Sequence, residues 1–485
     1  MKIYDAAEIR QWDQYTIQHE PISSIDLMER AAGLCCKHLL GVYSFNDVHF
    51  ICGMGNNGGD GLVMARILHR LGKKVNISIC SISEKGSADF ETNLKRLPAD
   101  ISINYLGEVD TFNTSAEIIV DCLFGSGLNR PVEGWLGNRI DEVNNCKKPI
   151  VAIDTPSGLF VGDNSSNPLN HIIKANYTFS FQTPKFSFLF ATYERYTGIV
   201  RIINIGLLEA FTTDALAEII KPKLFKAKKR SQFDHKGKKG FLTFVGGFDN
   251  MIGAAVLSTI AAFRAGCGYV GVICDDQGKQ ALFSRVPEAL YLGNEFIGVN
   301  EKTRAIAIGP SLGTSDKSKA TLKKVFSSNL PIVIDADGIN LCAQDSSLLK
   351  SLPKGTILTP HLKELERLIG KANSPEAFLQ KQIAFSVKHQ VFVIQKGAWS
   401  KLTTPNGKVF INPTGNPGMG TSGMGDALTG VIGSFLAQGF TPIQAAIQGI
   451  YYHGKAGDIV KQEQGETGIM TSDVIAALPR AINGF

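Results

Sequence analysis

The chain repeats one local order: a short run rich in β-branched residues, then a polar or glycine-rich loop, then residues with helical periodicity. In the first half, VHFIC (48–52) precedes GMGNNGGDG, IIVDC (118–122) precedes LFGSGLNRP, and PIVAID (149–154) precedes TPSG. Short apolar runs that alternate with helical segments are typical of buried parallel strands. We therefore expect an α/β sheet in which these three loops meet at the carboxyl ends of the strands, where ligands bind.

The second half restarts the same order. FLTFVGG and YVGVIC flank the apolar, helix-like run IGAAVLSTIAAFRAG, and AIAIGPSLG, PIVIDADGIN, TILTPHLKEL and VFVIQKGAWS each end in a polar loop. This order predicts a second parallel α/β sheet, so that the chain contains two three-layer α/β/α domains. A length of 485 residues also favours more than one domain.

The segment between the halves, KPKLFKAKKRSQFDHKGKKG (221–240), is rich in lysine and lacks apolar periodicity. We place the domain boundary at its start, which gives domains of residues 1–220 and 221–485. A solvated linker is the simplest interpretation of the segment. An electrostatic lip for a phosphate-bearing ligand and a nucleic-acid-binding arm are the alternatives.

Composition narrows the class of protein. An apolar fraction of 44%, a charged fraction of 19% and 50 glycines suit a folded α/β protein. The net charge of +6 is mild for this length and gives no general case for nucleic-acid binding. The nine cysteines form no CxxC pair, and several lie in strand-like runs, which predicts reduced, mostly buried thiols. Without a leader-like start or an apolar run of about 20 residues, we expect a cytoplasmic protein with no membrane partner.

The three loops of the first half carry oxygen-bearing side chains. GMGNNGGDG matches neither the GxGxxG fingerprint nor a P-loop, and a tight turn with left-handed Asn and Asp is the structural alternative. Asn57, Asp121 and Ser157 offer ligands that suit a hard cation of low charge rather than zinc. Asp154 ends its strand and would face the same crevice, where it binds ligand hydroxyls or moves a proton; an N-cap is the alternative.

The stretch GNPGMGTSGMGDALTG (415–430) predicts a phosphate cradle in the second half. Its glycines allow backbone N–H groups to surround an anion, and the apolar positions of residues 427–436 form one helical face directly after it. Asp426 would be repelled by a phosphate unless it takes a proton, which predicts a general base. Lys396 in QKGAWS follows a strand and is a candidate ligand of an adenosine phosphate, with a solvated loop lysine as the alternative.

Two further motifs of the second half have structural and functional interpretations. His361 in TPHLKEL lies at the start of a predicted helix, where it either binds substrate or caps the turn. Asp335 and Asp337 in DADGIN either help to bind a metal ion or form a turn after a strand.

The motifs NNGGDG, DCLFGSGLNRP and DTPSG, in this order, resemble the YjeF N-terminal domain of the NAD(P)H-hydrate epimerase family over about residues 1–215. The resemblance implies a Rossmann-like fold and an isomerase that interconverts the R and S forms of hydrated NAD(P)H. It implies a potassium ion held by Asn57, Asp121 and Ser157. Asp154 is the predicted proton-moving group, and Lys185 in FQTPKFSF is a second candidate. The implied substrate contacts are Asn56, Asn57, Gly58, Gly59, Asp60, Gly125, Ser126, Gly127, Leu128, Asn129, Arg130, Pro131 and Asp154.

The motifs GMGD, KGAWS, TPH, DADGIN, GPSLG and HKGKKG resemble the ribokinase-like superfamily and, within it, the NAD(P)HX dehydratase family, over about residues 225–485. The resemblance implies ADP as co-substrate, with ATP as an alternative, magnesium at the site, and Asp426 as the catalytic base. The implied nucleotide contacts are Lys396, Gly397, Ala398, Trp399, Ser400 and Gly425. The implied substrate contacts are Ala254, Gly313, His361 and Asp426. The chain departs from the family pattern at Ser311, at Leu362, in DADGIN and at Met424, where a small or hydroxyl residue is usual.

The two resemblances together imply a bifunctional isomerase and lyase that repairs hydrated nicotinamide nucleotides. The first domain inverts the R epimer, and the second dehydrates the S epimer with ADP, giving NAD(P)H, AMP and phosphate. Its partners would be these small molecules and further copies of the chain, without nucleic acid or membrane. A ribokinase-like small-molecule kinase fused to a nucleotide-binding module is one alternative, and a non-catalytic interaction module in the first half is another.

Overall fold

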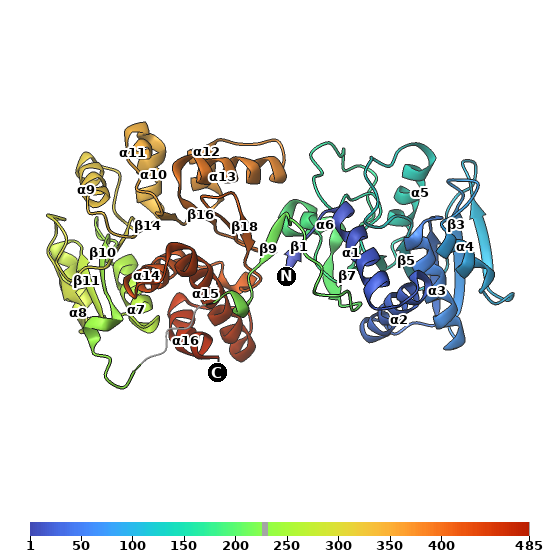
Figure 1. Ribbon diagram of the computed structural model, residues 1–485, viewed down its shortest axis with the longest axis horizontal. Coiled ribbons are helices and arrows are strands. Elements are labelled where there is room, and N and C mark those ends of the chain that lie inside the picture. The colour runs from blue at the N-terminus through green and yellow to red at the C-terminus, as the bar shows by residue number, and fades with distance from the viewer. Residues whose placement is uncertain (226–230, 485) are drawn as a thin grey trace. The chain divides into compact units, whose positions relative to one another are not determined.

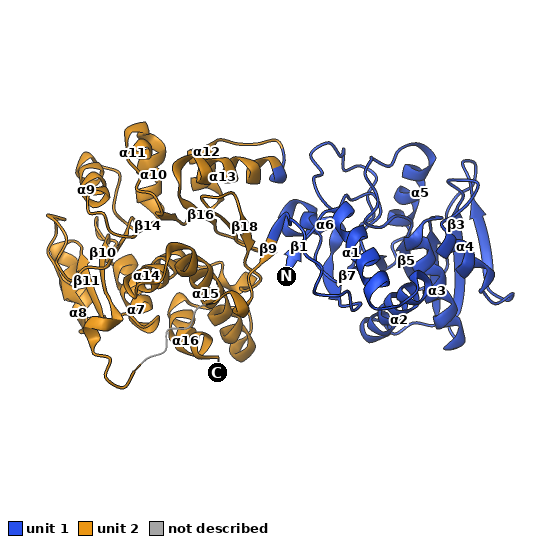
Figure 2. Ribbon diagram, viewed as in Figure 1, with its two compact units in different colours: residues 1–217, 374–376 blue, residues 218–373, 377–485 orange. Residues whose placement is uncertain are grey.

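The computed structural model describes residues 1–225 and 231–484, and the chain divides into two compact units (Figures 1 and 2). Unit 1 contains residues 1–217 and 374–376, and unit 2 contains residues 218–373 and 377–485. Part of the lysine-rich segment that we interpret as a linker, residues 226–230, lies outside the described residues.

Unit 1 is built on a seven-stranded parallel sheet. Its strand order is β4-β3-β2-β5-β6-β7-β8. The three strands predicted to carry the polar loops, β2, β5 and β6, are neighbours, with Cys52 opposite Cys122 and Asp121 opposite Ala152. The prediction that their loops meet at one edge of the sheet is therefore confirmed. The strands are β2 (Asp47–Cys52), β3 (Lys74–Cys80), β4 (Ser102–Leu106), β5 (Ile118–Cys122), β6 (Ile150–Ile153), β7 (Tyr177–Phe181) and β8 (Ile199–Ile203).

Helices cover both faces of this sheet. Phe50 packs in a cluster with residues of α1, α2 and α3, whereas the next residue, Ile51, packs in a second cluster with Ile140 and Val143 of α5. Successive strand residues point to opposite faces, so two separate clusters identify a three-layer arrangement. The helices are α1 (Ala6–His19), α2 (Ser24–Val42), α3 (Asn56–Arg70), α4 (Ala88–Lys95), α5 (Gly134–Asn145) and α6 (Glu194–Thr197).

Unit 2 is built on a mixed sheet. Its strands follow the order β9-β18-β17-β16-β15-β14-β13-β10-β11-β12, and those from β16 to β12 are parallel. The strand β17 is antiparallel to both β16 and β18, which the prediction of a parallel sheet did not include. The strands are β9 (Ala217–Ile219), β10 (Phe241–Val245), β11 (Tyr269–Ile273), β12 (Leu290–Tyr291), β13 (Ala305–Ile308), β14 (Ile332–Ile334), β15 (Ile357–Leu358), β16 (Phe392–Gln395), β17 (Lys401–Thr403) and β18 (Val409–Ile411).

Two apolar clusters again mark the two faces of the sheet. One joins the sheet to α7, α14, α15 and α16, and the other joins it to α9, α10, α12 and α13. The prediction of two α/β domains is confirmed, and so is the predicted helix after the glycine-rich stretch, which is α14. The helices are α7 (Ile252–Arg264), α8 (Lys279–Arg285), α9 (Asp316–Phe326), α10 (Ala336–Gln344), α11 (Ser346–Lys350), α12 (Leu362–Ile369), α13 (Pro375–His389), α14 (Met424–Ala437), α15 (Pro442–Gln464) and α16 (Thr471–Asn483).

The predicted state of the cysteines is also confirmed. All nine are free thiols, and every one except Cys146 is buried. Among the described residues, no helix combines the length and the apolar character that crossing a bilayer requires.

Candidate active sites

A cavity of about 300 Å³ opens in unit 1 beside the carboxyl ends of its strands. Helices α1 and α2 form one wall with largely apolar side chains. Polar side chains come from the start of α3, from the loops after β5 and β6, and from the segment after β7. Of the predicted site residues, the cavity is lined by Asn56, Asp60, Ser126, Asp154 and Lys185.

Asp154 is the most strongly held of these carboxylates. Its Oδ1 lies 2.7 Å from Lys185 Nζ, and both side chains are almost fully buried. The backbone N–H groups of Ser126 and Phe181 donate to the same carboxylate at 3.2 and 3.3 Å. Asp154 has a positive φ of 65° and caps no helix, so the N-cap alternative is wrong. The two candidates for proton transfer therefore form one buried ion pair on the cavity wall.

The segment NNGGDG is the first part of helix α3 rather than a loop. Asn56, Asn57 and Asp60 do not have positive φ, so the alternative of a left-handed turn is wrong. Asn56 and Asp60 are four residues apart on this helix and both line the cavity. Gly58 has no room for a side chain, because a Cβ would collide with the carbonyl oxygen of Gly53. The glycines therefore let the helix begin close against the end of β2.

Among the described residues, three more carboxyl groups line the cavity without a basic partner, those of Asp13, Asp60 and Asp89. Burial raises the pKa of Asp60 well above its usual value, and the nearby Asp154 and Asp13 add to the effect. Asp13 of α1 has its pKa raised to about 7, mainly by burial and also by the charge of Asp154, while Lys185 opposes the shift. Asp13 was not among the residues predicted from the sequence. The sequence signal that could have identified Asp13 is its position four residues after Ile9, on the apolar side of the helix.

Asn57, Asp121 and Ser157 come together around the backbone of Phe124. Ser157 Oγ donates to Asp121 at 2.6 Å, and Asn57 Nδ2 donates to the Phe124 carbonyl oxygen at 2.9 Å. Asn57 Oδ1 is buried but has no hydrogen-bond partner. Asp121 is fully buried, and no basic side chain pairs with it among the residues that the structure describes. An unpartnered oxygen beside a buried carboxylate fits an alkali cation held by oxygen ligands.

The loop after β5 contributes less to the cavity than the predicted range of contacts suggests. Within residues 125–131, only Ser126 is among the described residues that line it. Gly125 packs against Asn57, since a Cβ there would lie 3.1 Å from the Asn57 Cβ. Gly125 therefore supports the site without lining it.

In unit 2, the glycine-rich stretch leads directly into helix α14. Gly423 takes a left-handed conformation with φ of 88° and precedes the helix, so that Gly425 and Asp426 lie in its first turn. Burial raises the pKa of Asp426 to about 6, and the charge of Asp335 adds to this shift while Lys396 opposes it. A carboxyl group of this pKa is ionised at neutral pH and is still basic enough to accept a proton.

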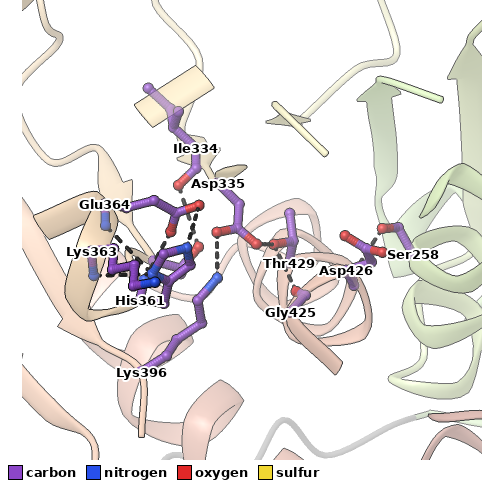
Figure 3. Close-up of polar contacts among 11 residues, drawn as sticks. Ser258, Ile334, Asp335, His361, Lys363, Glu364, Lys396, Gly425, Asp426 and Thr429 are labelled. Atoms are coloured by element: carbon purple, nitrogen blue, oxygen red, sulfur yellow. Dashed lines mark hydrogen bonds and ion pairs between the residues drawn. The ribbon is translucent and has the colours of Figure 1, made fainter. Parts of the chain in front are cut away.

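Asp335, at the end of β14, links three segments of the site (Figure 3). Lys396 Nζ donates to its Oδ1 at 2.6 Å, and Thr429 Oγ1 of α14 donates to its Oδ2 at 2.8 Å. Gly425 closes over this pair, since a Cβ on it would lie 3.1 Å from Lys396 Nζ. Lys396 is therefore not a solvated loop lysine: it is held at the first turn of the helix. Asp337 is engaged as well, because its Oδ2 accepts from the Gly313 N–H at 2.9 Å.

His361 caps a helix, as one of its two predicted roles required (Figure 3). Its Nδ1 accepts from the backbone N–H groups of Lys363 and Glu364 at the start of α12, and Glu364 accepts from the His361 N–H in return. About half of the imidazole remains exposed, so the cap does not occupy the whole ring. Ala254 lies at the start of α7, 9% exposed.

Met424, one of the departures from the family pattern, is the first residue of α14. Its side chain is 7% exposed and belongs to the apolar cluster between the sheet and α7, α14, α15 and α16. The loop itself is held from α15, where Asp458 accepts from the Gly415 N–H at 3.1 Å and from Asn416 Nδ2 at 3.0 Å. The departure at Met424 therefore adds an apolar side chain that anchors the first turn of α14.

Family models match both units. One, described as YjeF-related protein N-terminus, matches residues 24–187, and the other, described as NAD(P)H-hydrate dehydratase, matches residues 242–480. Fold and matches together define a two-domain α/β enzyme with a Rossmann-like and a ribokinase-like domain. Proteins called bifunctional NAD(P)H-hydrate repair enzyme Nnr resemble the chain over nearly its whole length. The protein of Moorella thermoacetica is 32% identical over 100% of this chain and 97% of its own, and that of Coxiella burnetii 31% over 99% of each. The chain belongs to this family of bifunctional NAD(P)H-hydrate repair enzymes.

A solved structure similar to unit 2 is that of an ADP/ATP-dependent NAD(P)H-hydrate dehydratase from Bacillus subtilis, co-crystallised with ATP and Mg²⁺. It is 28% identical, with a TM-score of 0.48, and the match covers 53% of this chain and 93% of that one.

Proposed function

We propose that the chain repairs hydrated nicotinamide nucleotides in two steps. Residues 1–220 interconvert the R and S epimers of hydrated NAD(P)H, abbreviated NAD(P)HX. Residues 221–485 dehydrate the S epimer with ADP, giving NAD(P)H, AMP and phosphate. One observation carries the proposal beyond family membership. Each unit places a lysine–aspartate pair and a separate carboxyl group of raised pKa at the carboxyl ends of its strands. Groups of this kind perform proton transfer at neutral pH.

In the epimerase site, Asp154 is proposed to exchange the proton of the substrate hydroxyl. Lys185 fixes the position of its carboxylate and offsets its charge in a buried setting. Asn56, Asp60 and Ser126 are proposed to bind the substrate, because they line the same cavity. The remaining proposed contacts of this site are Asn57, Gly58, Gly59, Gly125 and residues 127–131.

A potassium ion is proposed to be held by Asn57, Asp121 and Ser157. The unpartnered Oδ1 of Asn57 and the buried Asp121 carboxylate support it. Bound there, the ion would supply positive charge close to the loops that end β5 and β6. Ser157 also receives the Phe124 N–H at 2.9 Å, so the same residues fix the course of these loops.

In the dehydratase site, Asp426 is proposed to take the proton of the substrate hydroxyl while the terminal phosphoryl group of ADP transfers to that oxygen. Phosphate is a better leaving group than hydroxide, and it departs as the ring nitrogen donates its electron pair. The neighbouring ring carbon then loses a proton to the departed phosphate, which forms the C=C bond of NAD(P)H. The first turn of α14 and Lys396 stabilise the charge on the transferring group. The proposed nucleotide contacts are residues 396–400 and Gly425, and the proposed substrate contacts are Ala254, Gly313, His361 and Asp426.

Magnesium is expected to arrive with the nucleotide. Both oxygens of Asp335 are engaged by Lys396 and Thr429, and Asp337 accepts from the Gly313 N–H. These contacts fit a supporting role for the two carboxylates better than direct ligation. Mg²⁺ retains several waters and binds substrate phosphates readily, so we propose that ADP oxygens and water hold it. The predominance of buried, free thiols supports a reducing compartment such as the cytoplasm.

A single assay tests both activities. Mixed R and S hydrated NADH is supplied with ADP, and the return of reduced-nicotinamide absorbance is followed. Recovery of the whole pool is expected. Recovery of only the S fraction would contradict the epimerase assignment, and no recovery would contradict both. A stable phosphorylated product would instead identify the alternative small-molecule kinase.

A further inference from the structure

The cavity of unit 1 contains carboxyl groups to which the proposed steps assign no role. Asp13, Asp60 and Asp154 line it from α1, α3 and the end of β6. Lys185 pairs with Asp154 alone. No hydrogen bond or ion pair joins the side chain of Asp13 to another described residue, and its carboxyl group is therefore available to a bound molecule.

The charges around Asp13 come from every wall of the cavity. Asp60, Asp89, Asp154 and the two cations Arg10 and Lys185 all line it. Burial is the largest cause that raises the pKa of Asp13, to about 7, followed by the charge of Asp154. This shift favours the protonated form of Asp13, whereas the carboxylate of Asp154 is paired with Lys185. One cavity therefore offers a proton donor and a proton acceptor.

Inversion at the hydroxyl-bearing carbon by ring opening uses such a pair. That carbon is bonded to both an oxygen and the ring nitrogen, so the ring opens to an aldehyde if the carbon–nitrogen bond breaks. The hydroxyl must then lose a proton, and the nitrogen must gain one. The aldehyde group then rotates, and the nitrogen attacks the opposite face of the carbonyl carbon. This reclosure gives the opposite epimer.

We propose that Asp13 is a second catalytic residue of the epimerase site, which delivers its proton to the ring nitrogen while Asp154 accepts the hydroxyl proton. This inference rests on the proposed epimerase function. The electron pair of the O–H bond forms the C=O bond, and the pair of the carbon–nitrogen bond moves to nitrogen, which takes the proton of Asp13. On reclosure Asp13 recovers that proton and Asp154 returns the other. Both groups therefore end as they began, and no other reactant is consumed.

Asp60 is less suited to this step. Burial is the first cause that holds its pKa well above the usual range, and the side chain is only 7% exposed. A group that stays protonated donates a hydrogen bond but does not cycle between states. Asp13, whose pKa lies near the working pH, is suited to give up a proton and recover it.

The test uses the full chain with purified R epimer. Asp13→Asn is expected to lower the kcat of epimerisation by about 10²–10⁴-fold, with KM changed less than about threefold. Asp13→Glu keeps an acid and is expected to recover at least about a tenth of wild-type activity. Glu8→Gln, on the same helix but away from the cavity lining, is the matched control and should retain full activity. Dehydration of purified S epimer should be unchanged in all variants.

Two further measurements separate the proposal from a structural role. In the wild type, kcat/KM of epimerisation should fall above about pH 7 as Asp13 loses its proton, and this limb should vanish in Asp13→Asn. In ¹⁸O-labelled water, the inverted product should retain its original oxygen, because the carbon–oxygen bond stays intact.

Several outcomes would overturn the role of Asp13. These are Asp13→Asn activity within about threefold of wild type, equal losses in the Asn and Glu variants, an unchanged alkaline limb, or one ¹⁸O gained per inversion. A wild-type chain that does not epimerise at all would instead contradict the proposed function itself.

Discussion

The two units use one charge pattern in two different places. In unit 1, Lys185 and Asp154 form a buried pair at 2.7 Å on the wall of the ligand cavity. In unit 2, Lys396 and Asp335 form a pair at 2.6 Å, but there the aspartate also receives Thr429 and lies beneath the first turn of α14. The paired aspartate thus lines the cavity in unit 1, whereas in unit 2 it supports the first turn of α14.

The carboxyl groups without a lysine partner, those of Asp13 and Asp426, also differ between the two units. Asp13, whose pKa is raised to about 7, is the proposed acid, whereas Asp426, whose pKa is raised to about 6, is the proposed base. Burial is the first cause of both shifts. The difference teaches that a lysine–aspartate pair does not mark the base by itself; the position of the pair relative to the ligand decides its role.

The largest expected effect tests whether the two carboxylates act separately. Asp426→Asn should lower dehydration of purified S epimer by about 10²–10⁴-fold, because no base remains at the substrate hydroxyl, and should leave epimerisation unchanged. Asp154→Asn should give the reverse pattern. The return of absorbance measures dehydration, and chromatographic separation of the epimers measures inversion. Loss of both activities in either variant would contradict separate roles.

A second prediction concerns Met424, which anchors the first turn of α14 in unit 2. Met424→Ala should lower the free energy of unfolding of unit 2 by about 2–4 kcal/mol, because it leaves a cavity in a packed apolar cluster. The KM for ADP should change little. Urea denaturation followed by dehydratase activity measures the effect, with Met424→Leu as the volume-conserving control at less than about 1.5 kcal/mol. A large rise in KM without loss of stability would place Met424 in the anion site instead.

A third prediction concerns how strongly each of the two activities depends on potassium. Ser157→Ala removes the hydroxyl group that joins Asp121 to the Phe124 backbone, and it should raise the potassium concentration for half-maximal epimerisation by at least about tenfold. Dehydration by the same variant should keep its wild-type dependence on potassium. An equal shift in both activities, measured over one series of KCl concentrations, would contradict the assignment of the ion to Asn57, Asp121 and Ser157.

The smallest expected effect is a difference between two pH profiles. A raised pKa keeps Asp426 protonated to higher pH, so kcat/KM of dehydration should rise through about pH 6 to a plateau and be about tenfold lower at pH 5. Epimerisation should instead decline on the alkaline side through Asp13. Rates with purified S and R epimers in one buffer series measure both. A dehydration rate that is flat between pH 5 and 8 would exclude Asp426 as the base.

Much of the fold follows from local sequence. The runs that became β2, β5 and β6 are continuous and rich in β-branched residues, and the apolar spacing after Asp426 is helical, so short-range patterns were sufficient. The antiparallel β17 and β18 were missed, although their turn contains Pro-Asn-Gly at 405–407, with φ of 79° at Gly407. The pattern of the preceding parallel strands favoured one continued parallel sheet and outweighed the hairpin that this turn indicates.

The site was less predictable because its charges are set by distant parts of the chain. Lys396 and Asp335 are 61 positions apart, and no local pattern reports that they meet. Taken singly, the charged residues of α1 resemble ordinary solvent-exposed side chains. The pKa of Asp13 is raised by its burial in the cavity and by the charge of Asp154, and the sequence of α1 reports neither. Motifs therefore identified the residues at strand ends, whereas tertiary structure was needed to identify their ionic states.

The hydrogen bonds of Asp335 also bear on the order in which the two sites can form during synthesis. The cavity of unit 1 is lined by residues no later than Leu207, so its lining is complete before most of unit 2 leaves the ribosome. The dehydratase site needs Thr429, 94 positions after Asp335. Domains fold from the N-terminus as they emerge. All residues that line the cavity of unit 1 are therefore made before most of unit 2, whereas the proposed dehydratase site can form only after α14 has been made.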